Sequence, residues 1–302
     1  MVTKEILNFY KKTSLYTDLG LYKDFARSLP NDIKELCYLQ RHQIIHPFDM
    51  KDKEERNNAN SFYGDMTKIE ETSLCFENDL FPTAISILAE LLRRNENYTI
   101  DRPVEDKIHV CCREQAILLA SILKAKGIPA RVRSGFANYA CLGSGAGDHW
   151  ITEYYNEEKE RWVLVDADMY FDDETLKEYK IDFDLLDIPR DKFIFGAEAY
   201  LKLRNKEISD KEIYYSSTPK TYGLKGALHG LFYDFHSLMN NEIIFLHLPK
   251  YIIDKNLQLS EEEYVELDNL ARLMLDPDTN FGKLVEIWNN NTKFRIMTGG
   301  MN

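Results

Sequence analysis

Residues 112–131 read CREQAILLASILKAKGIPAR, and this stretch decides how the middle of the chain folds. Its alanine, isoleucine and leucine residues lie on more than one face of a 3.6-residue repeat, which predicts a largely buried helix over residues 112–126. Gly127 stands where a left-handed C-cap residue is wanted, and Pro129 prevents the helix from continuing. Residues 128–139 then change to the composition of a strand.

A hairpin is predicted after this strand. Residues 149–155 (HWITEYY) and 161–168 (RWVLVDAD) are rich in β-branched and aromatic side chains, which is typical of strands. The polar residues 156–159 lie between them and form a predicted hairpin loop. Ahead of the hairpin, residues 140–148 are small and rich in glycine, so residues 142–147 are a candidate lid.

The register of this hairpin brings a histidine and a carboxylate together. A four-residue loop at 156–159 places Tyr155 opposite Glu160, and counting back along both strands places His149 opposite Asp166. Directly opposite residues have Cβ atoms about 4.5–5.5 Å apart, which suits a carboxylate that orients an imidazole. A one-residue change in the loop centre would place Asp168 there instead, so both carboxylates are candidates.

Cys112 is the candidate nucleophile. It lies at or just before the first turn of the buried helix, where exposed backbone N–H groups and the positive end of the helix dipole favour a thiolate. A thiolate attacks acyl carbons, and the same N–H groups can donate to the oxyanion that forms after the attack. The helix start therefore predicts acyl-transfer chemistry.

Three blocks of sequence resemble, in order, the core of the transglutaminase-like superfamily. They are Cys112-Arg-Glu-Gln-Ala with the Lys126-Gly-Ile-Pro-Ala-Arg segment, His149-Trp-Ile-Thr-Glu, and Trp162-Val-Leu-Val-Asp. The resemblance implies an α+β, papain-like fold, in which the buried helix that begins at the cysteine packs on an antiparallel sheet. It also implies a catalytic triad of Cys112, His149 and Asp166.

The first block departs from the family at one position. The family commonly has glycine two residues before the nucleophile, and this chain has Val110 there, which keeps Cys111 as a competing nucleophile. The four-residue offset to Ala116 favours Cys112.

Helical patterns dominate the remainder. They cover residues 31–46 (with Asn31 as a possible cap), 83–95, 173–180, 191–204, 224–240, 260–275 and 280–290, while residues 51–66 are predicted to be a loop. We therefore expect a transglutaminase-like catalytic domain with N-terminal helices over residues 1–205. A mostly helical C-terminal extension is expected over residues 206–302.

Composition excludes several classes of partner. The 302 residues include 38 basic and 50 acidic side chains, so the formal net charge of −12 repels nucleic acid and anionic membranes. No run of eighteen apolar residues exists, and residues 1–12 lack the apolar core of a signal peptide, which predicts a cytoplasmic protein. The five cysteines are an odd number without C-x-x-C spacing, so free thiols are expected.

A metal site is not expected. His42 and His46 are four residues apart, but no HExxH glutamate or third ligand lies nearby in the sequence, so a surface or packing role is favoured. An alternative zinc site would use Cys111, Cys112, Cys141 and His149. Adjacent cysteines fit tetrahedral coordination poorly, and the predicted reaction needs neither a metal nor an organic cofactor.

The sequence thus predicts a cysteine-dependent acyl-transfer enzyme. Its donor would be a carboxamide in a peptide, a protein or a small molecule, held as a thioester on Cys112. Release to an amine would make it a transglutaminase or amide synthase, and release to water would make it a peptidase or amidase. The alternative is an inactive binding or scaffold protein with the same fold. The oligomeric state stays open.

Overall fold

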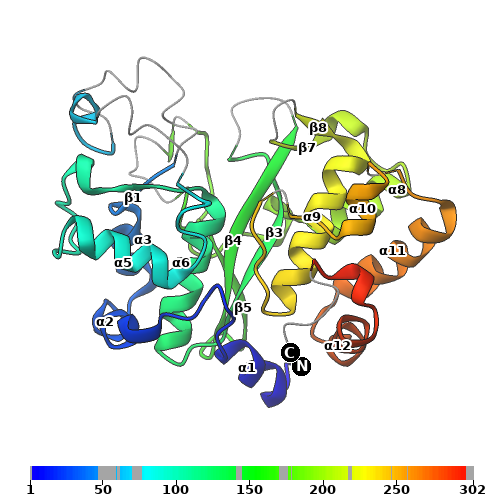
Figure 1. Ribbon diagram of the computed structural model, residues 1–302, viewed down its shortest axis with the longest axis horizontal. Coiled ribbons are helices and arrows are strands. Elements are labelled where there is room, and N and C mark those ends of the chain that lie inside the picture. The colour runs from blue at the N-terminus through cyan, green and yellow to red at the C-terminus, as the bar shows by residue number, and fades with distance from the viewer. Residues whose placement is uncertain are drawn as a thin grey trace. The chain divides into compact units, whose positions relative to one another are not determined.

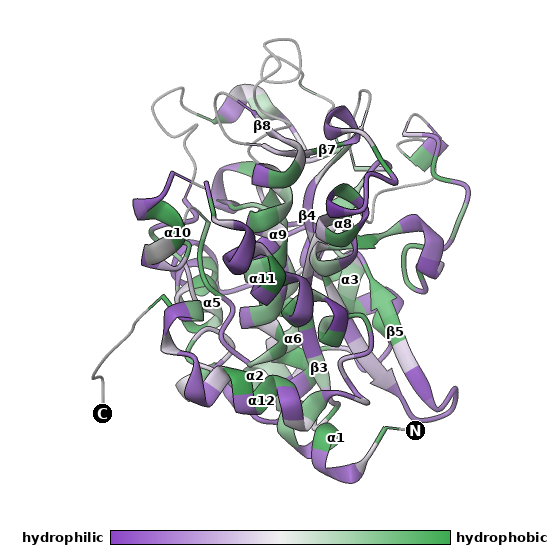
Figure 2. Ribbon diagram, turned by 90° about the vertical axis from the view of Figure 1, so that its right-hand side faces the viewer, coloured by the Kyte–Doolittle hydropathy of each residue, from purple (hydrophilic) through white to green (hydrophobic). Residues whose placement is uncertain are grey.

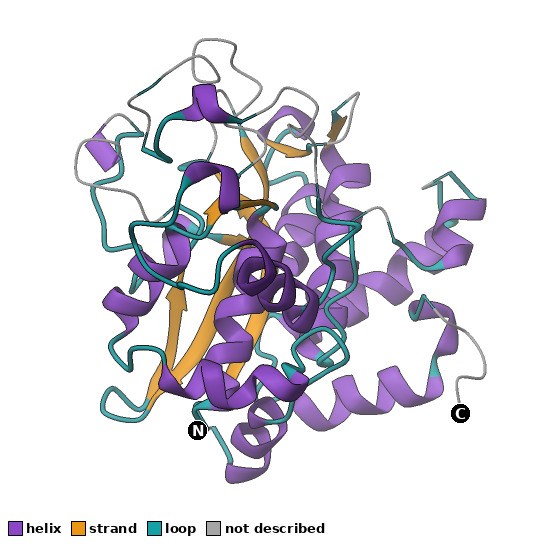
Figure 3. Ribbon diagram, turned by 60° about the vertical axis from the view of Figure 1, so that its left-hand side comes forward, coloured by secondary structure: helices purple, strands orange, loops and turns teal. Residues whose placement is uncertain are grey.

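The computed structural model describes residues 2–46, 59, 62–69, 77–140, 145–169, 176–177, 179–216, 220–245, 247–256 and 258–296. Helices and strands occur together in these residues, so the protein has the mixed α+β fold that the sequence predicts (Figure 3). The chain groups into two compact units. The cysteine unit comprises residues 11–130 and 151–188, and the helical unit comprises residues 1–10, 131–150 and 189–302. The predicted domain boundary after residue 205 stays a prediction.

The cysteine unit contains the region that the sequence singles out. Its described elements are η1 (Gly20–Tyr22), α2 (Lys23–Ser28), α3 (Ile33–Arg41), β1 (Ile44–Ile45), η3 (Met66–Lys68), α5 (Ala84–Arg94), η5 (Val104–Asp106), β2 (Ile108–His109), α6 (Cys112–Ala125), β5 (Arg161–Val165) and the second half of β4 (Ala146–Asn156). Strand β4 begins in the helical unit and continues in the cysteine unit.

Helix α6 forms the core of the cysteine unit. All fourteen of its residues are buried, as its apolar residues on every face predict. Helices α2, α3 and α5 contact it (Figure 1). The hydroxyl of Thr152, in β4, donates to the carbonyl oxygen of Ala116 at 3.0 Å, which ties the helix to the strand.

The end of α6 confirms the predicted glycine cap. Gly127 has φ +83°, a conformation that glycine adopts without a steric penalty. Its N–H donates to the carbonyl of Lys124 at 2.9 Å, and the N–H of Ile128 donates to the carbonyl of Leu123 at 3.0 Å. These two bonds satisfy carbonyl groups that the helix leaves unpaired at its end.

The predicted register of the hairpin is wrong by two residues. Strands β4 and β5 pair antiparallel from Asn156↔Arg161 to Thr152↔Val165, so Tyr155 lies opposite Trp162 and not opposite Glu160. The loop is centred one residue later than predicted, because the side chain of Asn156 caps the turn by accepting from the N–H of Lys159 at 2.8 Å. Glu160 closes the turn with φ +50°.

The helical unit contains the C-terminal helices. Its described elements are α1 (Lys4–Lys11), β3 (Ala130–Ala137), the first half of β4, η6 (Arg190–Lys192), β6 (Ile194–Phe195), α8 (Gly196–Arg204), η7 (Asp210–Glu212), β7 (Ile213–Tyr215), β8 (Thr221–Tyr222), α9 (Gly223–Leu238), α10 (Lys250–Asp254), α11 (Glu261–Met274), α12 (Phe281–Asn290) and η8 (Thr292–Phe294). Hydrophilic and hydrophobic residues both occur along α11 (Figure 2), while every residue of α9 from Gly226 to Leu238 is buried.

The sheet is mixed where the sequence predicts an antiparallel one. Its strands follow the order β6-β3-β4-β7-β8, with β5 paired to β4. Strands β3 and β6, β4 and β5, and β7 and β8 pair antiparallel, whereas β4 and β7 pair parallel. A parallel pair needs a long connection, and the segment between β4 and β7 that includes α8 supplies it.

Most predicted helices are present with small shifts of their ends. Asp32, and not Asn31, caps α3, because its side chain accepts from the N–H of Glu35 at 2.9 Å. The helix predicted from residue 191 begins only at Gly196, after a 3₁₀ turn and strand β6. The predictions for residues 51–66 and 173–180 fall partly outside the described residues. None of the described helices has the length and apolar character needed to cross a bilayer.

Replacing Gly196 by alanine is expected to destabilise the protein by about 1–3 kcal/mol or more. A Cβ at this position would lie 2.1 Å from the carbonyl oxygen of Gly230, so the backbones of α8 and α9 would have to separate. Gly282, in α12, is the matched control, because its Cβ would have no neighbour within 4 Å. Gly282→Ala should stabilise by up to about 1 kcal/mol. Chemical denaturation measures both, and equal effects would contradict the prediction.

Candidate active site

A short parallel strand pair brings two segments of the cysteine unit together. Strands β1 and β2 pair with Ile44 opposite Ile108 and Ile45 opposite His109. Because the strands run in the same direction, the residues that follow them leave the pair at the same end. His46 directly follows β1, and Cys112 comes three residues after β2.

The two adjacent cysteines occupy different positions at the start of α6 and have different contacts. Cys112 is the first residue of α6 and is 5% exposed. Cys111 occupies the N-cap position, and Asn78 binds it twice: the N–H of Cys111 donates to Asn78 Oδ1 at 2.9 Å, and Asn78 Nδ2 contacts Cys111 Sγ at 3.1 Å. The thiol of Cys111 is thus engaged by a neighbouring amide, and Cys112 has the position that the sequence predicts for a nucleophile.

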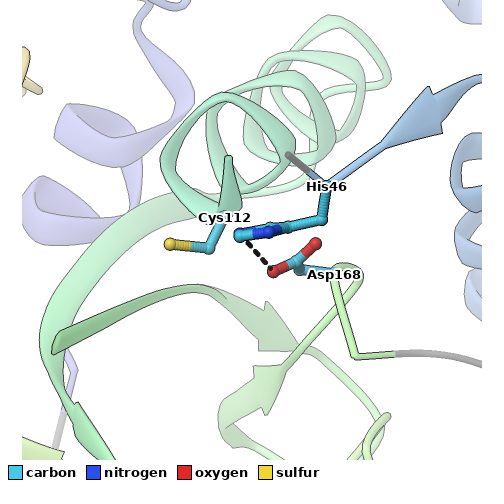
Figure 4. Close-up of side chains that lie close together, drawn as sticks. All are labelled: His46, Cys112 and Asp168. Carbon is cyan, nitrogen blue, oxygen red and sulfur yellow. Dashed lines mark ion pairs between the residues drawn. The ribbon is translucent and has the colours of Figure 1, made fainter. Parts of the chain in front are cut away.

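An imidazole and a carboxylate lie beside the Cys112 thiol. His46, Cys112 and Asp168 each present one nitrogen, sulfur or oxygen atom, and these three atoms lie within 4.8 Å of one another (Figure 4). His46 Nε2 is 3.5 Å from Asp168 Oδ2. Cys112 and Asp168 are buried, and the side chain of His46 is 13% exposed.

Hydrogen bonds fix Asp168 in this group. Gln115, one helical turn after Cys112, donates from Nε2 to Asp168 Oδ1. The backbone carbonyl of Gln115 in turn accepts from Gln40 Nε2 at 2.9 Å. Asp166, which is fully buried, accepts from the N–H groups of Asp168 at 3.0 Å and Met169 at 2.9 Å. Hydrogen bonds therefore hold both the backbone of the loop after β5 and the carboxylate of Asp168 in that loop.

A buried ion pair lies in the first turn of α6. Arg113 and Glu114 are both 0% exposed, and Arg113 Nη1 is 2.6 Å from Glu114 Oε1. Arg113 also donates to the carbonyl of Pro82 at 3.2 Å and lies 5.1 Å from the ring centre of Tyr16. Burial raises the pKa of Glu114, although Arg113 and the N–H of Cys111 oppose that shift.

The predicted triad draws on both units. Cys112 and Asp166 belong to the cysteine unit, while His149 lies in the part of β4 that belongs to the helical unit. His149 is 4% exposed, and its ring packs edge-on against Tyr139 with 6.1 Å between ring centres. The triad of Cys112, His149 and Asp166 stays a prediction. The count that placed Asp166 opposite His149 is wrong. Strands β4 and β5 pair as far as Thr152↔Val165, and continuing that register sets position 166 level with position 151 and position 168, the alternative that the sequence left open, level with position 149.

The place of His46 beside Cys112 carries no signal in the sequence. The surface or packing role expected of both histidines is confirmed for His42, whose Nδ1 lies 2.7 Å from the carbonyl oxygen of Tyr38 and whose ring packs on Phe62. Burial lowers the pKa of His42. Helix α3 ends at Arg41, so His46 does not continue the helical face of His42. The pair of two-residue strands that redirects His46 toward Cys112 is too short to produce a periodic signal.

The structure also tests the predictions for the lid and for the other cysteines. Ala146 and Gly147, assigned to a lid, pair in parallel with β7, and residues 142–144 lie outside the described residues. Cys75 and Cys141 also lie outside the described residues. No disulfide joins Cys37, Cys111 or Cys112, as predicted. Burial raises the pKa of Cys37, with a further contribution from Asp166, so this thiol is not activated.

The buried amine of Lys107, directly before β2, predicts that the stability of the protein depends on pH. Burial, with Arg41 and Arg102 nearby, lowers its pKa to about 7, and its Nζ donates to the carbonyl of Tyr63 at 2.7 Å. The unfolded chain then binds more protons than the folded protein above pH 7, so stability should rise by roughly 2 kcal/mol between pH 7 and 9. Urea unfolding at several pH values measures this rise.

The matched controls for this prediction replace single lysines by methionine. Lys107→Met should remove most of the rise, because the group that titrates is gone. Lys34→Met changes an exposed lysine of α3 and should leave the rise intact. A rise that survives Lys107→Met would assign the pH dependence to another group.

Comparison with known proteins supports the resemblance drawn from the sequence. Residues 93–167 match the family model described as the transglutaminase-like superfamily. This match covers less than half of the chain and contains Cys112, His149 and Asp166. The resemblance is therefore confirmed for this region. No curated protein matches the chain.

One solved structure, "a Putative Cysteine Protease from Cytophaga hutchinsonii", is similar at 14% sequence identity with a TM-score of 0.32. The alignment covers 56% of this chain and 44% of that chain, so this chain spans less than half of that protein. The family match and the grouped thiol, imidazole and carboxylate support a cysteine-based enzyme at the level of the superfamily.

Proposed function

We propose that this protein is a cysteine-dependent acyl-transfer enzyme with Cys112 as its nucleophile. The observation that carries the proposal is the position of Cys112 as the first residue of the fully buried helix α6, inside the region that matches the transglutaminase-like superfamily. The positive end of the helix dipole favours the thiolate form at this position. The thiolate is the form of cysteine that attacks an acyl carbon.

The proposed reaction has two steps. In the first, Cys112 Sγ attacks the carbonyl carbon of a carboxamide while His149 takes the thiol proton and passes it to the departing amine. The C–N bond breaks, and the acyl group remains as a thioester on sulfur. In the second step, an amine or a water molecule attacks the thioester and restores the thiol. The first outcome is that of a transglutaminase or amide synthase, and the second is that of a peptidase or amidase.

Two groups of the cysteine unit support these steps. In our proposal, backbone N–H groups at the start of α6 donate to the oxyanion, as N–H groups in the first turn of a helix can do. Asp166 is the proposed carboxylate that orients His149. Its Oδ1 is fixed by two backbone N–H groups, at 3.0 and 2.9 Å, which suits a group that must hold an imidazole in one orientation.

The test is acyl-enzyme formation measured by intact-mass spectrometry. The protein is incubated with a library of glutamine peptides, with and without primary amines, and quenched in acid. We expect an adduct whose mass equals that of the acyl group, located on Cys112 by peptide mapping. Loss of the adduct on addition of amine would indicate a transferase, and loss in buffer alone would indicate a hydrolase.

Variants distinguish this enzyme from an inactive scaffold. His149→Ala should abolish the adduct, because no base then takes the thiol proton. His42→Ala is the control: it replaces a histidine with a packing role, so the adduct should still form. A Cys112 thiol that reacts no faster with iodoacetamide than Cys37 does, in wild type and in every variant, would overturn the proposal. That outcome favours a binding or scaffold role for the fold.

A further inference from the structure

We propose that His46, Cys112 and Asp168 form a binding site for one transition-metal ion of the zinc class, and that the bound ion blocks the Cys112 thiol. The sequence does not predict this site, because these three residues are far apart along the chain. The structure brings their ligand atoms within 4.8 Å of one another. The site itself does not depend on the proposed function, but the inhibition does.

The spacing fits a tetrahedral ion after a small contraction. Zinc bonds are about 2.3 Å to sulfur and 2.0–2.2 Å to nitrogen and oxygen, so neighbouring ligand atoms around the ion lie roughly 3.3–3.8 Å apart. His46 Nε2 and Asp168 Oδ2 are already 3.5 Å apart. The Cys112 sulfur then has to approach these atoms by about 1–1.5 Å at most, which a side-chain rotation can supply.

The ligands are held by the surrounding structure. Gln115 donates to Asp168 Oδ1, so the other carboxylate oxygen, Oδ2, faces His46 (Figure 4). The β1–β2 pair positions His46 and the start of α6 positions Cys112. Hydrogen bonds from neighbouring residues orient metal ligands in this manner in established sites. Three segments that are far apart in the sequence thus place three donor atoms within 4.8 Å of one another.

The donor set selects the kind of ion. One sulfur, one imidazole nitrogen and one carboxylate oxygen favour zinc, cobalt or copper over magnesium or calcium, which prefer oxygen alone. Binding replaces the thiol proton by the metal ion and releases the proton to solvent. The fourth position of the ion would be filled by water, as in other three-ligand sites. A sulfur atom bound to the ion cannot attack an acyl carbon.

The experiment measures binding without any activity. The full-length protein is titrated with Zn²⁺ in competition with a chromophoric chelator, and with Co²⁺ while the absorption spectrum is recorded. We expect one ion per chain, a thiolate-to-cobalt charge-transfer band and the strong visible bands of tetrahedral cobalt. Even residues that only hydrogen-bond to a ligand change affinity by about 10–100-fold, so His46→Ala and Asp168→Asn should each weaken Zn²⁺ binding at least 100-fold.

Controls and variants separate the site from its neighbours. His42→Ala and Cys111→Ser alter the adjacent histidine and the adjacent thiol, and both should bind Zn²⁺ as the wild type does. Cys112→Ser should remove the charge-transfer band. Circular dichroism checks that each variant is folded. Retention of affinity in folded His46→Ala and Asp168→Asn, or cobalt binding without the charge-transfer band, would overturn the site.

Zinc binding and acyl-enzyme formation are measured separately, so the metal site and the proposed function can fail independently. If the acyl-enzyme forms on Cys112 and Zn²⁺ does not bind, the metal site is wrong and the function stands. If Zn²⁺ binds with the expected variant profile and no acyl-enzyme forms with any donor, the metal site stands. If both occur, equimolar Zn²⁺ should suppress the acyl-enzyme and a chelator should restore it.

Discussion

Replacing Cys112 by serine is expected to abolish acyl-enzyme formation and to lower turnover of any responsive acyl donor by on the order of 10⁴-fold or more. The serine hydroxyl occupies the same position at the start of α6, but it does not ionise at neutral pH, so the attacking group is lost while the helix is preserved. Intact-mass spectrometry and steady-state turnover measure the two effects. The free energy of unfolding should change by less than about 1 kcal/mol, because the replacement is nearly isosteric.

Cys111→Ser is the matched control, because it changes the neighbouring residue in the same way. The Cys111 side chain contacts Asn78 and is placed outside the helix, so its replacement should leave acyl transfer within about threefold of the wild type. A variant pair in which Cys111→Ser is inactive and Cys112→Ser is active would reverse the assignment of the nucleophile. Inactivity of both would mean that the helix start tolerates no change and would leave His149→Ala as the deciding variant.

The second large effect concerns stability. Replacing Asp234 by alanine is expected to destabilise the helical unit by about 3–5 kcal/mol, because it removes the carboxylate of a buried ion pair and leaves the guanidinium. Arg133 Nε is 2.8 Å from Asp234 Oδ1, and Arg133 Nη2 is 2.9 Å from Oδ2. Asp234 Oδ1 also accepts from the N–H of Ser134 at 3.2 Å, and the guanidinium lies 3.8 Å from the ring centre of Phe195. Thermal and urea unfolding measure the loss.

A surface ion pair of the same unit supplies the control. Arg190 pairs with Glu198 at 2.7 Å, but the arginine side chain is 54% exposed, so Glu198→Ala should destabilise by no more than about 1 kcal/mol. Similar losses in the two variants would show that burial does not determine the strength of the Arg133–Asp234 pair.

The features that the sequence predicts well arise from neighbouring residues. The helices predicted over residues 112–126 and 260–275 and the glycine cap at Gly127 depend on local patterns, and each is present with small shifts of the helix ends. The helix of α11 even begins with the reciprocal cap of Ser260 and Glu263. Such signals are contained within a few turns of one element, so no tertiary contact is needed to interpret them.

The features that the sequence does not predict depend on a single shifted residue or on distant segments. The hairpin register is displaced because Asn156 ends a strand instead of beginning the loop, and one residue of loop shift moves the pairing by two. The position of His46 depends on the pairing of β1 with β2, whose residues are about sixty apart in the sequence and carry no period of their own. The grouping of Asp168 with Cys112 likewise depends on Gln115 and on the turn held by Asp166.

The brevity of the β1–β2 ladder has a consequence for amide hydrogen exchange. Only two residues of each strand are paired, whereas α6 is a fourteen-residue helix buried on every side. Local opening of so short a ladder requires far less free energy than global unfolding, so the amide of Ile108 can exchange through a fluctuation that leaves the helix protected. We expect the imidazole of residue 46 to move away from the sulfur during such an opening while the start of the helix keeps its form. The thiol would then have two electrostatic surroundings within one folded protein, in proportions that temperature and denaturant alter.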